Sequence, residues 1–151
     1  MHVITPGPER TIATPNAVMT PLAAPSTGST TLSTWRVRME PGASGPLHTV
    51  DREQVWTVLS GALAVTTGDR TETVRAGQTL VLPAGTERRV RTAGDAAPES
   101  DVVPAGAVPP DDTGVPDDAG AGGPVEALVA MPADGRVSTP DQGPRPLPWA
   151  V

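Results

Sequence analysis

The feature that most restricts the fold of this chain is the spacing of its proline and glycine residues. The 151 residues include 19 Pro and 16 Gly, which recur every few residues over much of the chain. Because both residue types are unfavourable inside helices, this spacing argues against long helices. The apolar segments between them are short and rich in Val, Leu and Thr, as is typical of strands. We therefore predict one all-β domain with one core.

Strands are predicted where apolar and polar residues alternate between these breakpoints. Residues 31–39 alternate Trp, Val and Met with Arg, which indicates a half-buried strand. Residues 55–67 and 71–75 are expected to form a hairpin across a Gly-Asp turn. Further strands are expected at 16–24, at a sheet edge and interrupted by Pro21, and at 79–82, 88–91 and 125–131. Short strands at this spacing are typical of a sandwich or barrel.

Composition divides the chain into four segments. Residues 1–15 are rich in Pro and Thr, and we expect an extended N-terminal arm. Residues 16–93 supply the first part of a barrel. Residues 94–124 form an acidic insertion rich in Pro, Gly and Ala, which has too little apolar surface to offset its ordering entropy and is expected to be flexible. Residues 125–151 supply the final barrel strand and a C-terminal tail, in which Trp149 is expected to pack down.

Several chemistries and partners are excluded by composition. The chain has no Cys, so a disulfide, a thiolate metal site and a Cys nucleophile are impossible. All eleven basic residues are Arg, so Schiff-base catalysis by Lys is excluded as well. A net charge of −6 without a basic tract argues against nucleic acid as a partner. Without an apolar run of membrane-spanning length or a secretory signal, we expect no membrane partner and a cytoplasmic location.

Glycines at fixed spacings surround the internal histidine, His48. Gly42 and Gly61 flank it, with Val50 and Gln54 between His48 and Gly61. A second set at fixed spacing follows, and it consists of Gly77, Pro83, Gly85, Arg88 and Thr92. Both spacings resemble the two motifs of the cupin family, over residues 31–92 of the chain. The resemblance implies a double-stranded β-helix, or jelly-roll barrel, with an enclosed pocket.

The resemblance also implies a metal centre, for which this chain lacks the ligands. In metal-dependent cupins two His and one Glu of the first motif and one His of the second motif bind one ion. Here His48 remains, while Val50, Gln54 and Arg88 hold the other three places. Because a transition metal needs three or four N, O or S ligands, we predict a metal-free protein with no cofactor.

The family geometry implies that His48, Gln54 and Arg88 face the barrel interior, and strand parity adds Trp56. An imidazole, an amide and a guanidinium in an apolar pocket suit a small ligand with a carboxylate or phosphate group. In this interpretation Arg88 pairs with the anion, Gln54 orients a polar group and Trp56 offers a flat contact surface.

Structural roles are open for the same residues. Arg88 can be neutralised by Glu53 or Glu87, or can extend to the barrel mouth. Gln54 can make a structural hydrogen bond, and Trp56 can belong to the core.

Three functions are compatible with these residues. The first is a metal-free cupin that binds a small anionic organic molecule as a binding or accessory protein. The second is a metal-independent isomerase, epimerase or cyclase in which His48 is the acid or base and Arg88 stabilises negative charge. The third is a non-catalytic interaction module that forms a homodimer through the arm and exposed strand edges.

Overall fold

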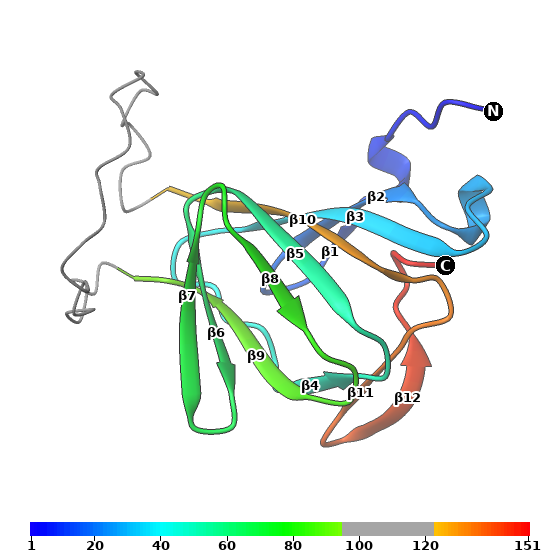
Figure 1. Cartoon of the computed structure of the whole chain (residues 1–151). Coiled ribbons are helices and arrows are strands. Elements are labelled where there is room, and N and C mark those ends of the chain that lie inside the picture. The colour runs from blue at the N-terminus through cyan, green and yellow to red at the C-terminus, as the bar shows by residue number, and fades with distance from the viewer. Residues whose placement is uncertain (95–122) are drawn as a thin grey trace, which may run out of the picture.

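The computed structural model describes residues 1–94 and 123–151, which form two facing antiparallel sheets (Figure 1). Each sheet has six strands, in the orders β1-β2-β3-β10-β5-β8 and β12-β11-β4-β9-β6-β7. Consecutive strands often lie in different sheets, as in a jelly roll. The predicted all-β jelly-roll barrel is therefore confirmed. Except at its ends, the predicted acidic insertion lies outside the described residues.

The strands are short, as the spacing of Pro and Gly predicts. The first sheet contains β1 (Ile12–Ala13), β2 (Val18–Ala23), β3 (Leu32–Met39), β10 (Val125–Pro132), β5 (Gln54–Ser60) and β8 (Thr79–Leu82). The second contains β12 (Gln142–Pro146), β11 (Arg136–Thr139), β4 (His48–Val50), β9 (Glu87–Thr92), β6 (Ala62–Thr67) and β7 (Arg70–Arg75).

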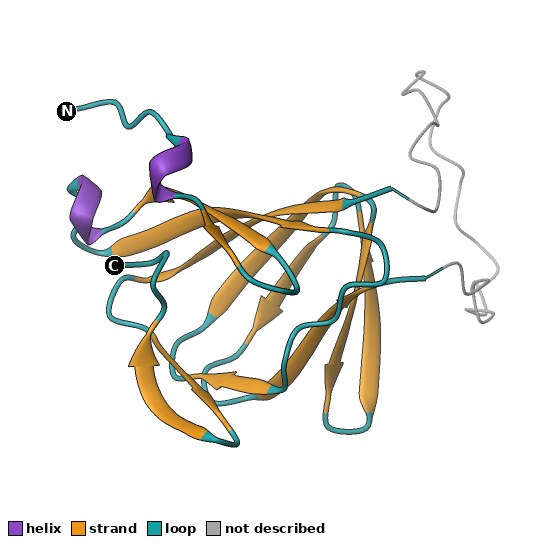
Figure 2. Cartoon of the chain, turned by 180° about the vertical axis from the view of Figure 1, so that it is seen from behind, coloured by secondary structure: helices purple, strands orange, loops and turns teal. Residues whose placement is uncertain are grey.

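Two short 3-10 helices, η1 (Pro8–Arg10) and η2 (Pro25–Thr27), lie near the N-terminus (Figure 2). No helix in the described part of the chain has the length and apolar character needed to cross a bilayer.

The core lies between the two sheets and follows the alternation of the sequence. On β3, Trp35, Val37 and Met39 are buried and the arginines between them are exposed. On β10, which pairs with both β3 and β5, every second residue is buried. Because a strand turns successive side chains to opposite faces, one face of each sheet closes the barrel interior.

The motif glycines lie at turns that require a left-handed backbone. Gly42, Gly61, Gly77 and Gly85 have φ values of +79°, +70°, +83° and +73°. A residue with a Cβ is disfavoured in this region, whereas glycine adopts it readily. The predicted hairpin forms in its second part, where β6 and β7 pair across a turn in which Gly68 has φ +56°. The predicted 55–67 strand is broken at Gly61, and its first part is β5 in the other sheet. The spacing of these glycines therefore encodes the turns between strands.

Four strands were not predicted, namely β1 in the N-terminal arm and β4, β11 and β12, and each depends on tertiary pairing. β4 has only three residues and is held between β11 and β9. β11 and β12 follow β10, which the sequence indicated as the last strand. β12 contains Pro144 and Pro146, which a strand tolerates because β12 is the edge of its sheet.

The N-terminal segment differs from the prediction in two respects. The arm is not wholly extended, because it contains η1, and its extended part β1 pairs with β2. The prediction that 16–24 lies at a sheet edge is therefore wrong for the start of β2, where Met19 pairs with Ile12. The pairing of β1 along β2 does not reach Pro21. The register between β2 and β3 shifts between Pro21 and Ala23. That irregularity accommodates a residue without an N–H.

The C-terminal tail packs against the first sheet, as expected from its tryptophan. The rings of Trp149 and Trp35 are 6.5 Å apart in an edge-to-face arrangement. Leu147 and Ala150 are buried, and the buried hydroxyl of Ser33 donates to the Ala150 carbonyl at 2.6 Å. The tail therefore belongs to the core.

The β5–β6 turn provides a test of the glycine requirement. A Cβ on Gly61 would lie 3.0 Å from Val125 Cγ2, whereas a Cβ on Gly68 would have no neighbour within 4 Å. We expect Gly68→Ala to lower the free energy of unfolding by about 1 kcal/mol, the cost of a left-handed backbone. Gly61→Ala adds a packing conflict and should cost at least about 1 kcal/mol more. Denaturant unfolding measures both values, and equal losses would contradict the role of the Val125 contact.

Candidate functional site

Arg88 on β9 is fully buried, with 0% of its surface exposed. Its Nε donates to the Thr86 carbonyl at 2.9 Å. Its Nη2 donates to the carbonyls of Pro83 at 3.1 Å and Val50 at 3.5 Å. The 83–86 loop and β4 therefore hold the guanidinium with neutral acceptors.

Gln54 on β5 connects Arg88 to the opposite sheet. Its side-chain oxygen accepts from Arg88 Nη1 at 3.1 Å and from Trp56 Nε1 at 3.3 Å. Its amide nitrogen donates to Met131 Sδ at 3.7 Å. Gln54 and Trp56 are buried, so these bonds fix the amide in place. The structural hydrogen bond considered for Gln54 is present, and Trp56 lies in the core.

No carboxylate in the described residues lies within 4 Å of the Arg88 guanidinium. Glu53 and Glu87 are exposed and do not pair with it, and Arg88 does not reach the surface. Burial lowers the pKa of Arg88, but a guanidinium stays protonated in a protein. The barrel therefore contains a buried positive charge that neutral dipoles stabilise and that no carboxylate of the described residues balances at close range.

His48 is half-buried and pairs with Arg88 across β4 and β9. Its Nδ1 lies 2.9 Å from the Pro46 carbonyl. Since a carbonyl only accepts, Nδ1 carries the proton and the neutral ring has its lone pair on Nε2. Burial lowers the pKa of His48, the bond to Pro46 opposes this, and the Arg88 charge lowers the pKa further. The imidazole is therefore held in its neutral form near pH 7.

The residues at the family's metal-ligand places do not fit a metal ion. Val50 is apolar and buried, and the Gln54 oxygen already accepts two hydrogen bonds. Arg88 adds a cation, which repels another. In the described residues no three His, Cys, Asp or Glu side chains form a group that could hold an ion. The arrangement offers one imidazole, where a transition-metal site needs three or four ligands.

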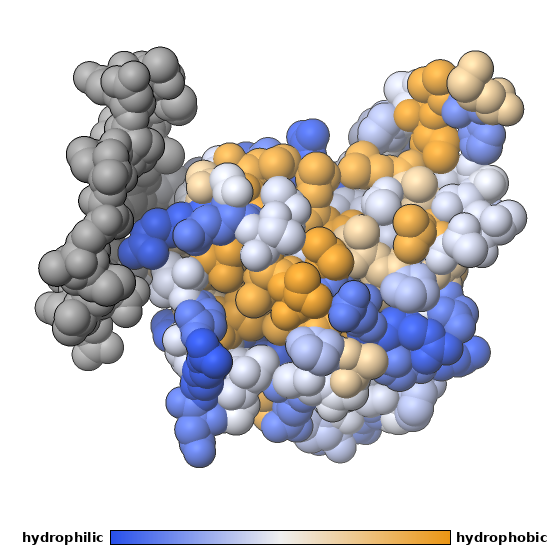
Figure 3. Space-filling model, viewed as in Figure 1, coloured by the Kyte–Doolittle hydropathy of each residue, from blue (hydrophilic) through white to orange (hydrophobic). Residues whose placement is uncertain are grey.

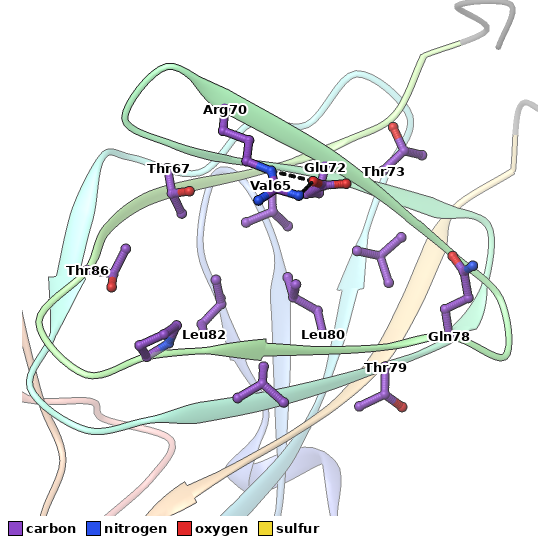
Figure 4. A pocket seen from close by; sticks show the side chains of 13 residues that line it. Val65, Thr67, Arg70, Glu72, Thr73, Gln78, Thr79, Leu80, Leu82 and Thr86 are labelled. Atoms are coloured by element: carbon purple, nitrogen blue, oxygen red, sulfur yellow. Dashed lines mark hydrogen bonds and ion pairs between the residues drawn. The ribbon is translucent and has the colours of Figure 1, made fainter. Parts of the chain in front are cut away.

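A cavity of about 740 Å³ lies between β7 and β8 (Figure 4). On the face seen in Figure 3, hydrophobic residues gather around β8 and β5. The cavity is lined by Val65, Thr67, Arg70, Glu72, Thr73, Val74, Gln78, Thr79, Leu80, Val81, Leu82, Pro83 and Thr86.

None of the four predicted site residues lines this cavity. They lie close behind its wall, because Leu80 and Leu82 are the cross-strand partners of Trp56 and Gln54. Pro83 and Thr86, whose carbonyls bind the Arg88 guanidinium, also border the cavity. The structure thus brings the predicted residues together beside a cavity that the sequence did not indicate.

Sequence reasoning missed Arg70 and Glu72, the charged residues of the cavity. Arg70 Nε donates to Glu72 Oε1 at 2.6 Å. The signal that could have revealed them is parity, because Arg70, Glu72 and the buried Val74 are alternate residues of one strand. Arg70 and Glu72 lie on the same strand face as the buried Val74, so this face of β7 runs from the core to a polar entrance of the barrel.

Removal of the Arg88 side chain should destabilise the barrel. Arg88→Ala leaves three carbonyls and the Gln54 oxygen short of a donor and creates a void, so we expect a loss of about 2–5 kcal/mol in unfolding free energy. The matched control is Arg89→Ala, at the next position of β9, where the side chain is exposed. It should change stability by less than about 0.5 kcal/mol. Denaturant unfolding measures both, and equal small losses would contradict the network.

Stability should depend on pH through His48. The unfolded histidine has a pKa of about 6.5, and the folded one has a lower pKa. Below pH 6.5 the unfolded chain therefore binds more protons, so stability is complete above this value and is lost as pH falls towards the folded pKa. We expect His48→Gln to reduce the stability loss between pH 7.5 and pH 5.5. Denaturant unfolding at several pH values measures this loss. If the unfolding free energy falls equally with pH in the wild type and in His48→Gln, the lowered pKa of His48 does not contribute.

Comparisons with known proteins agree with this architecture. Residues 35–99 match the model of the family described as "Cupin domain". A search of curated proteins finds no match.

Solved structures with a similar fold include three proteins with different descriptions. The polyketide cyclase RemF from Streptomyces resistomycificus is 19% identical, with a TM-score of 0.61, over 93% of this chain and 83% of its own. A cupin 2 domain-containing protein from Halorhodospira halophila is 16% identical, with a TM-score of 0.58, over 87% and 70%. A Bacillus subtilis oxalate decarboxylase variant is 19% identical, with a TM-score of 0.56, over 80% and 27%. Residues 35–99 thus match a cupin domain, and the solved structures share the two-sheet fold of the chain.

Proposed function

We propose that this cupin-domain protein binds a small anionic organic molecule at its barrel without a metal ion. The observation that carries the proposal is the Arg88 guanidinium, a buried cation without a carboxylate within 4 Å in the described residues. Similar solved structures include a cyclase and a decarboxylase, so the fold alone does not select a reaction.

The electrostatics of the barrel favour an anion. The guanidinium has five N–H donors and makes four hydrogen bonds, which leaves one Nη1 hydrogen without an acceptor among the described residues. A charge surrounded by protein is screened less than one in water, so its attraction reaches the adjacent cavity. Arg88 attracts the anion, Gln54 holds the guanidinium in place, and Trp56 fixes Gln54.

Gln54→Glu tests this proposal without removing the arginine. A carboxylate at this position lies next to Arg88 Nη1 and neutralises the cation, so ligand anions lose their attraction while the fold is kept. We expect carboxylates or phosphates, but not neutral sugars, to raise the melting temperature of the wild type by several degrees. Gln54→Glu should lose this response.

Arg89→Gln is the control and should respond like the wild type. Elemental analysis of the purified wild type should show far less than one metal ion per chain. A Gln54→Glu variant with an unchanged anion response, or a stoichiometric metal, would contradict the proposal.

A second candidate function is acid-base catalysis by His48. The observation that favours it is the neutral tautomer, whose Nε2 lone pair can accept a proton from a bound substrate. In a metal-independent isomerase, epimerase or cyclase, His48 would act as the base and Arg88, its cross-strand partner, would stabilise negative charge. His48→Gln would then retain ligand binding and lose turnover, whereas loss of both would favour a binding role.

The predicted homodimer and cytoplasmic location stay predictions. Leu59 on β5 and Val81 on β8 are 43% and 51% exposed, but single exposed aliphatic residues are normal on a protein surface and do not by themselves indicate an interface.

A further inference from the structure

The cavity between β7 and β8 has an apolar wall built from both sheets. Val65 and Val74 contribute from the second sheet, and Leu80 and Leu82 from the first. The two strands diverge from the turn that contains Gln78, so the space between them opens at the sheet edges (Figure 4). A volume of about 740 Å³ is within the range of small-molecule pockets.

Among the described residues that line the cavity, Arg70 and Glu72 are the ones that carry a formal charge. Thr67 lies opposite Arg70 on β6, and Val65 lies opposite Glu72. The ion pair therefore sits on the β7 side, facing the leucines of β8 (Figure 4). The Arg70 and Glu72 side chains are 79% and 49% exposed, so the pair is weak and can be exchanged for another partner.

We propose that this cavity binds an organic monocarboxylic acid with an apolar body, and that Arg70 holds the carboxylate in place of Glu72. The inference rests on the proposed function and names the ligand class and the residue that contacts it. The aliphatic wall takes the chain or ring of the acid, which excludes a sugar as the preferred ligand. One arginine beside one glutamate suits a single negative charge, because Glu72 repels a second one.

Arg70 and Arg88 have different roles in this arrangement. Arg70 is exposed and contacts the carboxylate directly, as a guanidinium does in two parallel hydrogen bonds. Arg88 lies behind Pro83 and Thr86 and contributes through its charge. Glu72 is a competitor of the ligand, so its neutralisation should strengthen carboxylate binding.

Titration calorimetry with 2-naphthoate and its neutral analogue 2-naphthamide tests the inference on the full chain. The wild type should bind naphthoate more tightly than naphthamide. Arg70→Gln should reduce naphthoate affinity to that of the amide. Glu72→Gln should raise naphthoate affinity by about two- to fivefold, the gain expected when a weak ion pair no longer competes. Naphthamide affinity should not change in either variant.

Arg75→Gln is the matched control, because Arg75 is exposed on the same strand and does not line the cavity. It should bind both probes like the wild type. Equal affinity of the wild type for both probes, no binding of naphthoate, or unchanged binding by Arg70→Gln overturns the inference. If naphthoate binding survives Arg70→Gln but is lost in Gln54→Glu, the proposed function stands and this inference fails. If Arg70→Gln loses naphthoate binding while Gln54→Glu binds it fully, the site at Arg70 is supported. The role proposed for Arg88 is then contradicted.

Discussion

The hydrogen bonds of the Arg88 guanidinium are the interaction on which the interior of this barrel depends. A buried cation is costly unless its donors are satisfied, and here they join several elements. Nη1 binds Gln54 on the first sheet, while Nη2 binds the carbonyl of Val50 on the second. Nε and Nη2 also hold the loop between β8 and β9. One side chain thus links both sheets and one of the turns that connect them.

This network changes the chemistry that the barrel can perform. A guanidinium and an amide stand where metal-dependent cupins have ligands, and the buried charge belongs to the protein itself. The adjacent imidazole of His48 is kept neutral by burial and by that charge. The open space lies instead between the sheet edges β7 and β8, where aliphatic side chains meet an exposed ion pair. Charge and cavity are therefore neighbours separated by a single layer of residues.

Local rules predicted much of the fold and part of the site. The turns at Gly61 and Gly77 follow from a backbone conformation that only glycine adopts readily. The inward position of Gln54 was implied by the cupin resemblance, and that of Trp56 follows from it by strand parity. The short strand β4 and the proline-containing β12 escaped prediction, because their pairing with distant strands supports them and their own sequences do not.

The sequence by itself determined the class of fold and the turns, because these depend on residue type and near-neighbour spacing. Only the tertiary structure decided that Arg88 would bind carbonyls and Gln54 while Glu53 and Glu87 stay exposed. The tertiary structure also decided where the cavity opens. Hydrogen-bond donors and acceptors on separate strands meet only after the sheets close. β7 and β8 diverge because β7 pairs with β6 in one sheet and β8 pairs with β5 in the other.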